Sequence, residues 1–355
     1  MLMLVTCAGI LVVDLIAADL PRISSPGEVT YTPRGIEMHI GGHCGNVSVD
    51  LRGLGVQEWM VSATGAVGKD IFGDFILDLL RNNGVVAHLQ RISGSGTSKD
   101  LILVVKGEDR RFHTDIGANW HLSPEYVLRV LEGEKPRIFY VGGVGLTGRL
   151  DESLADVLKR AREIGSITFV DPVRPYMHGW EFLISSLKYT SIFHCNMDEA
   201  RKITGFDDPA AAASSLRMMG ADMAVVSLGE KGLVAAIGDS IFEIPAFKVP
   251  VIDPTGAGDA LCAGIIHGLL RLINHECSIL DLSRDDVIDV LLEGAAAGAS
   301  CVTMVGTTTA VTCENVARIL REQGDDLRAK VRVKPLWAEM RRRRNRWESQ
   351  RRHIR

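Results

Sequence analysis

Short apolar runs alternate with amphipathic stretches through the middle of the chain. The runs Ile138–Val141 and Ile167–Val170 are short enough to be buried strands, and Asp151–Ile164 between them has a helical pattern. Further strands are expected at Ser191–His194 and Met223–Leu228. This alternation predicts an α/β fold with a mostly parallel central sheet and helices on both faces. Ligands of such sheets bind beyond the carboxyl ends of the strands.

The N-terminal third has a different pattern. Glu28–Ile40 alternates apolar and polar residues around a turn at Pro33–Gly35, which predicts a pair of short strands. Two more strands are expected at Thr97–Val105 and Arg110–Thr114. The apolar start, Met1–Leu15, lacks a basic region and is interrupted by an Asp, so we interpret it as a buried first strand rather than a signal peptide.

The stretch Val249–Leu270 combines a strand, a tight turn and the start of a helix. The amides of a helix's first turn lack internal partners, and small residues such as Gly256–Gly258 let an anion approach them closely. Asp259 would repel a phosphate bound there, so it needs another role. A general base that takes a proton from an attacking hydroxyl fits, and the alternative is an ordinary helix N-cap.

The string D-P-T-G-A-G-D-A, which ends at Ala260, resembles the C-terminal signature of the ribokinase/PfkB family of sugar kinases. Three upstream motifs agree with this resemblance in the expected order. They are a Gly-x-x-x-x-Asp spacing at Gly9 and Asp14, a G-G-x-x-x-N signature at Gly41, Gly42 and Asn46, and an N-x-x-E pair at Asn196 and Glu199. The resemblance covers roughly residues 5 to 320. It implies a ribokinase-like fold in which a small β-sheet lid covers the sugar.

The resemblance also implies roles for these residues. Asp259 is the base, and the backbone amides of Gly256, Ala257 and Gly258 stabilise the charge that develops on the phosphate. The acceptor sugar is held by Asp14, Gly41, Gly42 and Asn46.

The resemblance also implies which residues bind the phosphoryl donor and its metal ions. Asn196 and Glu199 order a magnesium ion through water, although without the family this pair would be interpreted as a helix cap. The strand and turn that carry Ser227, Gly229 and Gly232 lie along the nucleotide, ATP. Asp253 and Thr255 occupy positions where the family often binds a monovalent cation such as potassium.

Two positions depart from the family. Val173 stands where an Asn near the phosphates is usual, and Ala295 stands where some relatives have an Asn close to the adenine.

The function implied is transfer of the γ-phosphoryl group of ATP to a hydroxymethyl group of a small sugar, which is ribose-, fructose- or keto-sugar-like. One alternative is a nucleoside kinase of the same family, which an aromatic residue stacked on the base would favour. Tyr31 and Phe112 are the candidates for that stack. The other alternative is a regulator that binds sugar or nucleotide without turnover.

Composition is that of a soluble globular protein, with 46% hydrophobic and 24% charged residues among 355. Seven cysteines without a C-x-x-C pair favour reduced thiols in the cytoplasm. Residues 335–355 carry eight Arg and two Glu, so the remainder of a chain with net charge −4 carries −10. Such a body is a poor nucleic-acid binder, and no uncharged apolar run is long enough for a membrane span.

The expected organisation is one kinase domain at 1–330, with lid strands at about 28–40 and 97–119, and a basic tail at 331–355 that catalysis does not need. An exposed edge of the lid sheet would invite pairing, so we expect a homodimer through the lid.

Overall fold

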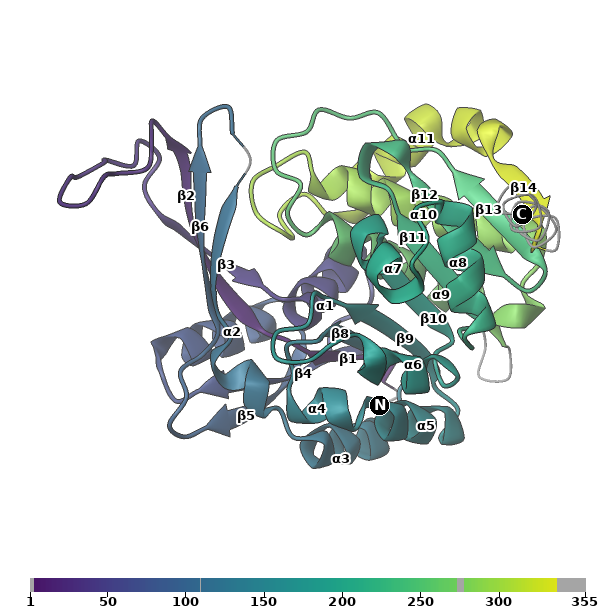
Figure 1. Ribbon diagram of the computed structural model, residues 1–355, viewed down its shortest axis with the longest axis horizontal. Coiled ribbons are helices and arrows are strands. Elements are labelled where there is room, and N and C mark those ends of the chain that lie inside the picture. Colours follow the sequence, from purple (N-terminus) through teal and green to yellow (C-terminus); the bar gives the residue numbers. More distant parts are fainter. Residues whose placement is uncertain (1–2, 109, 273–277, 337–355) are drawn as a thin grey trace, which may run out of the picture.

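The computed structural model describes residues 3–108, 110–272 and 278–336. It contains two sheets, a ten-stranded one in the body and a four-stranded one beside it (Figure 1). The body sheet has the order β14-β13-β12-β11-β10-β9-β8-β1-β4-β5. Its strands from β11 through β5 are parallel, and β12, β13 and β14 are antiparallel additions at one edge. The predicted α/β class with a mostly parallel central sheet is therefore confirmed.

The strands of the body sheet are mostly short and apolar, as expected when both faces are covered. Their bounds are β1 Val5–Gly9, β4 Val61–Gly68, β5 Val86–Ile92, β8 Ile138–Val144, β9 Ile167–Pro172, β10 Ile192–Asn196, β11 Met223–Ser227, β12 Leu233–Ile237, β13 Ser240–Ile244 and β14 Arg332–Pro335.

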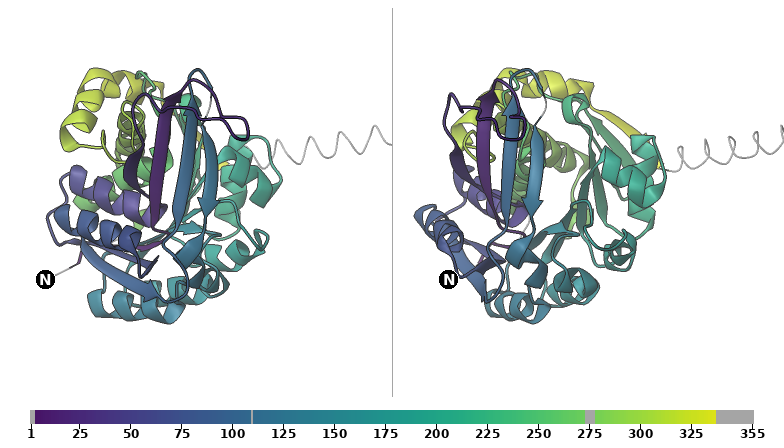
Figure 2. Two further views of the ribbon diagram at one scale, coloured as in Figure 1. Left: turned by 90° about the vertical axis from the view of Figure 1, so that its left-hand side faces the viewer. Right: turned by 60° about the vertical axis from the view of Figure 1, so that its left-hand side comes forward.

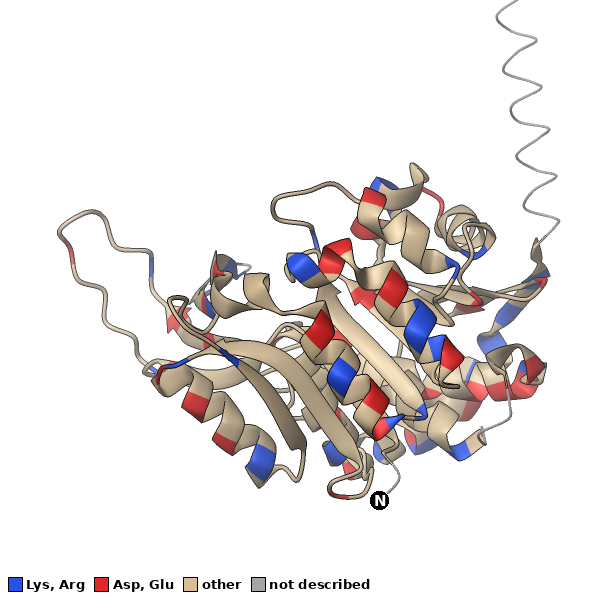
Figure 3. Ribbon diagram, turned by 90° about the horizontal axis from the view of Figure 1, so that it is seen from below, with Lys and Arg blue, Asp and Glu red and all other residues tan. Residues whose placement is uncertain are grey.

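Helices cover both faces of this sheet over two hydrophobic cores. One core lies under α1, α2, α9, α10 and α11, and the other lies under α3 to α8. Successive residues of β8 alternate between them, with Tyr140 in the first core and Phe139 in the second. Charged residues of both signs are interspersed along the outer helices (Figure 3). Among the described helices, none is long and apolar enough to cross a membrane.

The α-helices are α1 His43–Gly53, α2 Ile71–Asn82, α3 Pro124–Glu134, α4 Arg149–Glu152, α5 Leu154–Glu163, α6 Glu181–Leu187, α7 Met197–Thr204, α8 Pro209–Met218, α9 Ala257–Leu272, α10 Arg284–Cys301 and α11 Cys313–Lys330. Three short 3₁₀ helices are η1 Gly117–His121, η2 Gly229–Lys231 and η3 Ile279–Asp281.

The four-stranded sheet is the lid, and it stands beside the body (Figures 1 and 2). Its order is β3-β2-β6-β7, with β2 Val12–Leu20, β3 Glu37–Gly41, β6 Lys99–Val105 and β7 Arg111–Asp115.

The strand pair expected across Glu28–Ile40 is wrong in part, because only Glu37–Gly41 forms a strand. The central lid strand is instead β2, which follows β1 almost directly. Alternating apolar residues form a strand only where a neighbour offers hydrogen bonds, and β2 already pairs on both sides, with β3 and β6. Val29 and Tyr31 therefore lie exposed in the connection between β2 and β3.

One side chain ties two of the four places where the chain crosses between body and lid. Leu11 lies between β1 and β2, and Asn119 lies in η1 after β7. The Leu11 amide donates to Oδ1 of Asn119 over 3.1 Å, and Nδ2 of Asn119 donates to the Leu11 carbonyl over 2.9 Å. Asn119 is buried, so this pair of bonds anchors the base of the lid.

The folded domain extends past the expected boundary at residue 330. Residues Arg332–Pro335 form β14, which pairs with β13, and the Leu336 amide donates to the Asp239 carbonyl over 2.8 Å. The sequence pattern did not predict this strand, because its few apolar residues are flanked by basic ones. Such a composition is common in edge strands. Trp337 and the rest of the basic tail lie outside the described residues.

Candidate active site

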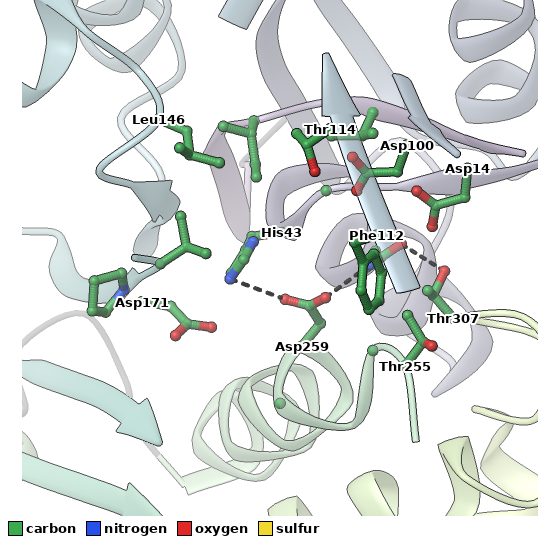
Figure 4. Close-up of a pocket in the computed structure, with 18 of the residues that line it drawn as sticks. Asp14, His43, Asp100, Phe112, Thr114, Leu146, Asp171, Thr255, Asp259 and Thr307 are labelled. Atoms are coloured by element: carbon green, nitrogen blue, oxygen red, sulfur yellow. Dashed lines mark hydrogen bonds and ion pairs between the residues drawn. The ribbon is translucent and has the colours of Figure 1, made fainter. Parts of the chain in front are cut away.

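Two pockets adjoin at the carboxyl ends of the body strands. The first has a volume of about 470 Å³ and lies between the lid and the ends of β9 and β10 (Figure 4). The second has a volume of about 720 Å³ and lies between η2 and the helices α9 and α10. Ser227, Pro254, Ala257 and Gly258 line both pockets. A group bound in the second pocket can therefore reach the first across the turn before α9.

That turn requires glycine at its tightest point. Gly256 has a φ of 80°, and a Cβ there would lie 2.8 Å from Cβ of Thr307. Helix α9 begins one residue later, at Ala257, so its first-turn amides lie beside the first pocket. Those amides and the helix dipole favour an anion at this point.

Asp259 lies inside the first turn of α9 rather than ahead of it, and its carboxylate bonds to another element. Oδ2 accepts from Nδ2 of Asn46 over 2.8 Å, and Oδ1 lies 3.9 Å from Nε2 of His43. Burial raises the pKa of Asp259, His43 opposes that rise and Asp171 adds to it. The carboxylate is thus oriented by α1 and has a raised proton affinity, as a general base requires.

Asn46 is itself held in place. Its Oδ1 accepts from Oγ1 of Thr307 over 2.8 Å, and that hydroxyl also lies 2.9 Å from the Ile40 carbonyl. Asn46 lines the first pocket and is 3% exposed. The side chain expected to contact the acceptor is therefore also the link between Thr307 and Asp259.

A buried ion pair lies next to Asp259. Nδ1 of His194 and Oδ1 of Asp171 are 2.9 Å apart, and the hydroxyl of Tyr140 donates to Asp171 over 3.1 Å. Burial alone would raise the pKa of Asp171, but His194 lowers it, and Asp171 in turn raises the pKa of His194. Ligand atoms of His43, Asp171 and Asp259 lie within 4.8 Å of one another, close enough to share an ion.

Asn196 and Glu199 form a capping box on α7. The Glu199 amide donates to Asn196 over 3.0 Å, and the Asn196 amide donates to Oε2 of Glu199 over 2.9 Å. Both residues line the first pocket. Burial raises the pKa of Glu199 to about 7. The pair is thus a helix cap, and Oε1 of Glu199 is still a hard oxygen donor of the kind that a hydrated magnesium ion accepts.

Asp14 enters the first pocket from β2 on the lid side. Both of its carboxylate oxygens lie 2.4 Å from the position that a Cβ on Gly41 would take, so only glycine leaves room there. Gly42 lines the pocket, with a φ of 80°. Burial, with Asp100 next in effect, raises the pKa of Asp14 to about 8.

Asp253 and Thr255 meet an arginine from the lid. One guanidinium nitrogen of Arg110 donates to Oδ1 of Asp253 over 2.9 Å and also to Oγ1 of Thr255. On the other side, the Gly306 amide lies 3.4 Å from Oδ2 of Asp253. A side-chain cation therefore already neutralises the carboxylate that was expected to help bind a monovalent ion.

The second pocket has mostly apolar walls. Gly229 and Gly232 line one side, and Phe247, Val249 and Leu261 are among the apolar residues of the others. Ala295 also lines it, at the position where some relatives have Asn. This wall suits a flat base held by packing.

The structure thus gathers most of the sequence-derived residues at one place. Those that line the first pocket are Asp14, Gly42, Asn46, Asn196, Glu199, Ser227, Thr255, Gly256, Ala257, Gly258 and Asp259. Gly229 and Gly232 line only the second pocket. Gly41 and Asp253 line neither, and each supports a neighbour that does.

Several pocket residues carried no assigned role in the sequence. His43 stands within the G-G-x-x-x-N signature, and Asp100 and Thr114 are polar residues inside lid strands. The place of His43 inside that signature was a signal that could have been used, whereas only the register of the lid strands brings Asp100 and Thr114 to the pocket. Thr307 had none, because it lies 261 residues from Asn46 along the chain.

Comparison with known proteins identifies the family of the chain. The family described as "pfkB family carbohydrate kinase" matches residues 3–313. The chain is 29% identical over 281 residues to the aminoimidazole riboside kinase of Salmonella typhimurium strain LT2, covering 76% of this chain and 84% of that protein. It is 25% identical to the ribokinase of Lactococcus lactis, covering 78% of this chain and 86% of that one.

Solved structures agree in fold. The ribokinase of Giardia lamblia superposes with a TM-score of 0.78 at 21% identity, covering 91% of this chain and 99% of that one. The ribokinase-like fold with its lid sheet is therefore confirmed, and the chain belongs to the pfkB family of carbohydrate kinases.

Proposed function

We propose that this kinase transfers the γ-phosphoryl group of ATP to a hydroxymethyl group of a small sugar, with Asp259 as the general base. One observation carries the proposal. The Asp259 carboxylate lines the lid-covered pocket, is oriented by Asn46, and lies two residues after the first residue of a helix whose start suits an anion. A hydroxyl bound there would meet the base and the phosphate together.

Each residue then has a physical task. Asp259 accepts the proton of the attacking hydroxyl. The amides of Gly256, Ala257 and Gly258 stabilise the charge on the transferring group. Glu199 would hold a hydrated magnesium ion, which supplies positive charge to the phosphates when bound. Asp14, Gly41, Gly42 and Asn46 shape and line the acceptor side.

A nucleoside acceptor is the second candidate, and one side chain favours it. Phe112, from β7, lines the acceptor pocket and offers an aromatic face (Figure 4). Tyr31 is 84% exposed and does not line the pocket. The relative from Salmonella, which is named for a riboside, is consistent with this alternative. A regulator without turnover is disfavoured by the presence of both Asp259 and Glu199 in the pocket.

Asp259→Asn tests the proposal. Asn keeps the size and the contact with Asn46 but cannot accept a proton. Turnover of ATP is measured with a panel of sugars and nucleosides, together with a melting curve. General-base catalysis is worth about 10²–10⁴-fold, so kcat should fall by that much while KM and stability change little. Near-wild-type turnover in the variant would overturn the assignment of the base.

Three further features belong to the proposal. The apolar outer face of the lid supports a homodimer through the lid sheet. The described cysteines are free, which supports a cytoplasmic location. Activation by potassium through Asp253 and Thr255 is retained, and Arg110 should make it weak. Equal rates in sodium, potassium and a bulky organic cation would remove potassium from the mechanism.

A further inference from the structure

A row of polar side chains crosses the lid sheet. Asp14 on β2 is in register with His39 on β3 and with Asp100 on β6, and Asp100 is in register with Thr114 on β7. Residues in register on neighbouring strands point to the same face, with Cβ atoms about 5 Å apart. Asp14, Asp100 and Thr114 all line the first pocket. Figure 4 shows the two carboxylates side by side, on the lid side of the cavity.

Neither carboxylate is fully satisfied by the described part of the protein. Asp14 is 4% exposed, and no described residue donates a hydrogen bond to its carboxylate. Oδ1 of Asp100 is buried and has no hydrogen-bond partner in the described part of the chain. Burial raises the pKa of Asp100, and a hydrogen bond from the hydroxyl of Thr114 opposes that rise. Buried carboxylate oxygens without donors are costly, so this pair is arranged for a ligand that brings donors of its own.

The charged residues that line the first pocket indicate which charge its ligand should carry. Its described lining contains Asp14, Asp100, Asp171, Glu199 and Asp259 but no Lys or Arg. The two histidines of the lining, His43 and His194, interact with Asp259 and Asp171 and thus compensate charge at the opposite end. At the lid end the described lining therefore offers an anionic acceptor no positive charge to pair with.

We propose that Asp100 is a second acceptor-binding carboxylate, and that the Asp14–Asp100 pair selects an acceptor with a positively charged nitrogen over its neutral and anionic analogues. This inference rests on the proposed kinase function and names the acceptor class for the same pocket. An ammonium group brings three N–H donors and a positive charge to the unsatisfied oxygens. The ring of Phe112 lines the same pocket, and the guanidinium carbon of Arg110 lies 5.4 Å from its centroid, so a ligand cation can pack on the face that Arg110 leaves open.

Ligand binding at the Asp14–Asp100 pair should be linked to the release of a proton. Asp14, with a pKa of about 8, is largely protonated at neutral pH in the empty pocket. A bound ammonium favours its ionised form, so binding of an amine should release close to one proton, whereas binding of a neutral sugar should release none. The titratable groups that face the pair are Asp259 and His43 across the pocket, Asp253 behind it and His39 beside it on β3.

The test uses two sets of related acceptors that carry positive, zero or negative charge. They are D-ribose, D-ribosamine and D-ribonate, with glucose, glucosamine and gluconate as a second set. The full-length wild type should use the amine with a kcat/KM about ten-fold above that of the neutral sugar, and should leave the acid untouched. Calorimetric titration in two buffers of different ionisation enthalpy measures the proton release directly.

Variants then assign the effect to Asp100. Asp100→Asn should bring the ratio of amine to neutral sugar to about one, and Asp100→Glu should retain the preference. Asp115→Asn is the matched control, because Asp115 is an exposed carboxylate on β7 of the same sheet. If Asp100→Asn fails to fold, Asp100→Glu and the wild-type ratios still decide the question.

The two hypotheses fail separately. Turnover of neutral sugars with no preference for amines, or a preference that survives Asp100→Asn, overturns the role of the carboxylate pair and leaves the kinase. Proton-linked amine binding that is lost in Asp100→Asn, in a protein that phosphorylates nothing, supports the pair and overturns the kinase proposal.

Discussion

Nδ2 of Asn46 donates a hydrogen bond of 2.8 Å to Oδ2 of Asp259, although 213 residues separate them along the chain. The amide and the carboxylate come from the first turns of α1 and α9, two helices that begin beside the same pocket. Because an amide nitrogen can only donate, it fixes one carboxylate oxygen and leaves the other facing His43. The orientation of the base is thus set from the N-terminal half of the chain.

Thr307 should act on catalysis through Asn46. Thr307→Val keeps the shape but removes the hydroxyl that donates to Oδ1 of Asn46. The amide can then rotate, and the base loses its alignment, so kcat should fall by about ten-fold with little change in KM. Steady-state kinetics measure this. Thr303→Val is the control, because its hydroxyl bonds to the Ser300 carbonyl. Equal rates for the two variants would contradict the link.

His43 should set the acidic limb of the pH–rate profile. Burial raises the pKa of Asp259 and His43 lowers it, so His43→Gln should raise it further. A base works only when deprotonated, so the acidic limb should move to higher pH. The profile of kcat/KM against pH measures the shift. His88→Gln serves as a control away from the pocket, and a limb that stays in place in His43→Gln would rule out this coupling.

Asp50 should destabilise the folded protein. It is fully buried in α1, and neither carboxylate oxygen has a hydrogen-bond partner among the described residues. Burial, with Asp259 next in effect, raises its pKa well above the usual value. Asp50→Ala should therefore raise the free energy of unfolding by about 1–2 kcal/mol.

The sign of its pH dependence follows from linkage. Asp50 is protonated in the folded protein at pH values where it is ionised in the unfolded chain, so wild-type stability falls as pH rises above about 4. The increase in the free energy of unfolding that Asp50→Ala causes should therefore become larger as the pH rises over the same range. Denaturant titrations at several pH values measure it. Ser48→Ala, which removes a hydroxyl bonded to the Gly45 carbonyl, is the control and should lose stability at every pH. A pH-independent gain for Asp50→Ala would argue against a raised pKa.

The lid should carry the dimer contact. On its outer face, Met38, Leu15 and Leu101 lie in one row by register, and Met38 and Leu101 are 44% and 42% exposed. Light scattering at micromolar concentration should give a dimer mass for the wild type and a monomer mass for Leu101→Glu. Ile184→Glu, on exposed α6, is the matched control and should remain dimeric. A monomeric wild type would remove the idea.

Two truncations should behave differently. Removing the residues after Leu336 should leave turnover and melting temperature unchanged. Removing those after Lys330 also deletes β14, including Val333, which packs against the core, and leaves the edge of β13 unpaired. This shorter protein should melt several degrees lower. Loss of turnover in a folded protein that ends at Leu336 would give the tail a catalytic role.

The body of the fold could be predicted because buried parallel strands leave a strong pattern. The apolar runs that begin at Ile138, Ile167 and Met223 became β8, β9 and β11. The lid was less predictable. The break between β1 and β2 at Ile10 and Leu11 lies inside one apolar run, so one long strand was expected where two sheets meet.

The site divides in the same way. Residues such as Asp259 and Glu199 could be found because each lies inside a short contiguous motif that is visible in the sequence. Asp100 could not be distinguished from a polar residue on the solvent face of a strand, since only its register with Asp14 brings it to the pocket. Arg110 reaches Asp253 across 143 residues, a contact that no local pattern encodes.

The bonds between Asn119 and Leu11 fix one point at the base of the lid, and a rotation of the lid would turn about this point. Asp14 lies three residues beyond Leu11, about 10 Å along an extended strand, whereas Arg110 lies just before β7, at the far end of the β6–β7 hairpin. A given angle of rotation therefore moves Arg110 through a much longer arc than Asp14. Any such rotation would therefore change the contact of Arg110 with Asp253 and Thr255 more than it changes the position of Asp14.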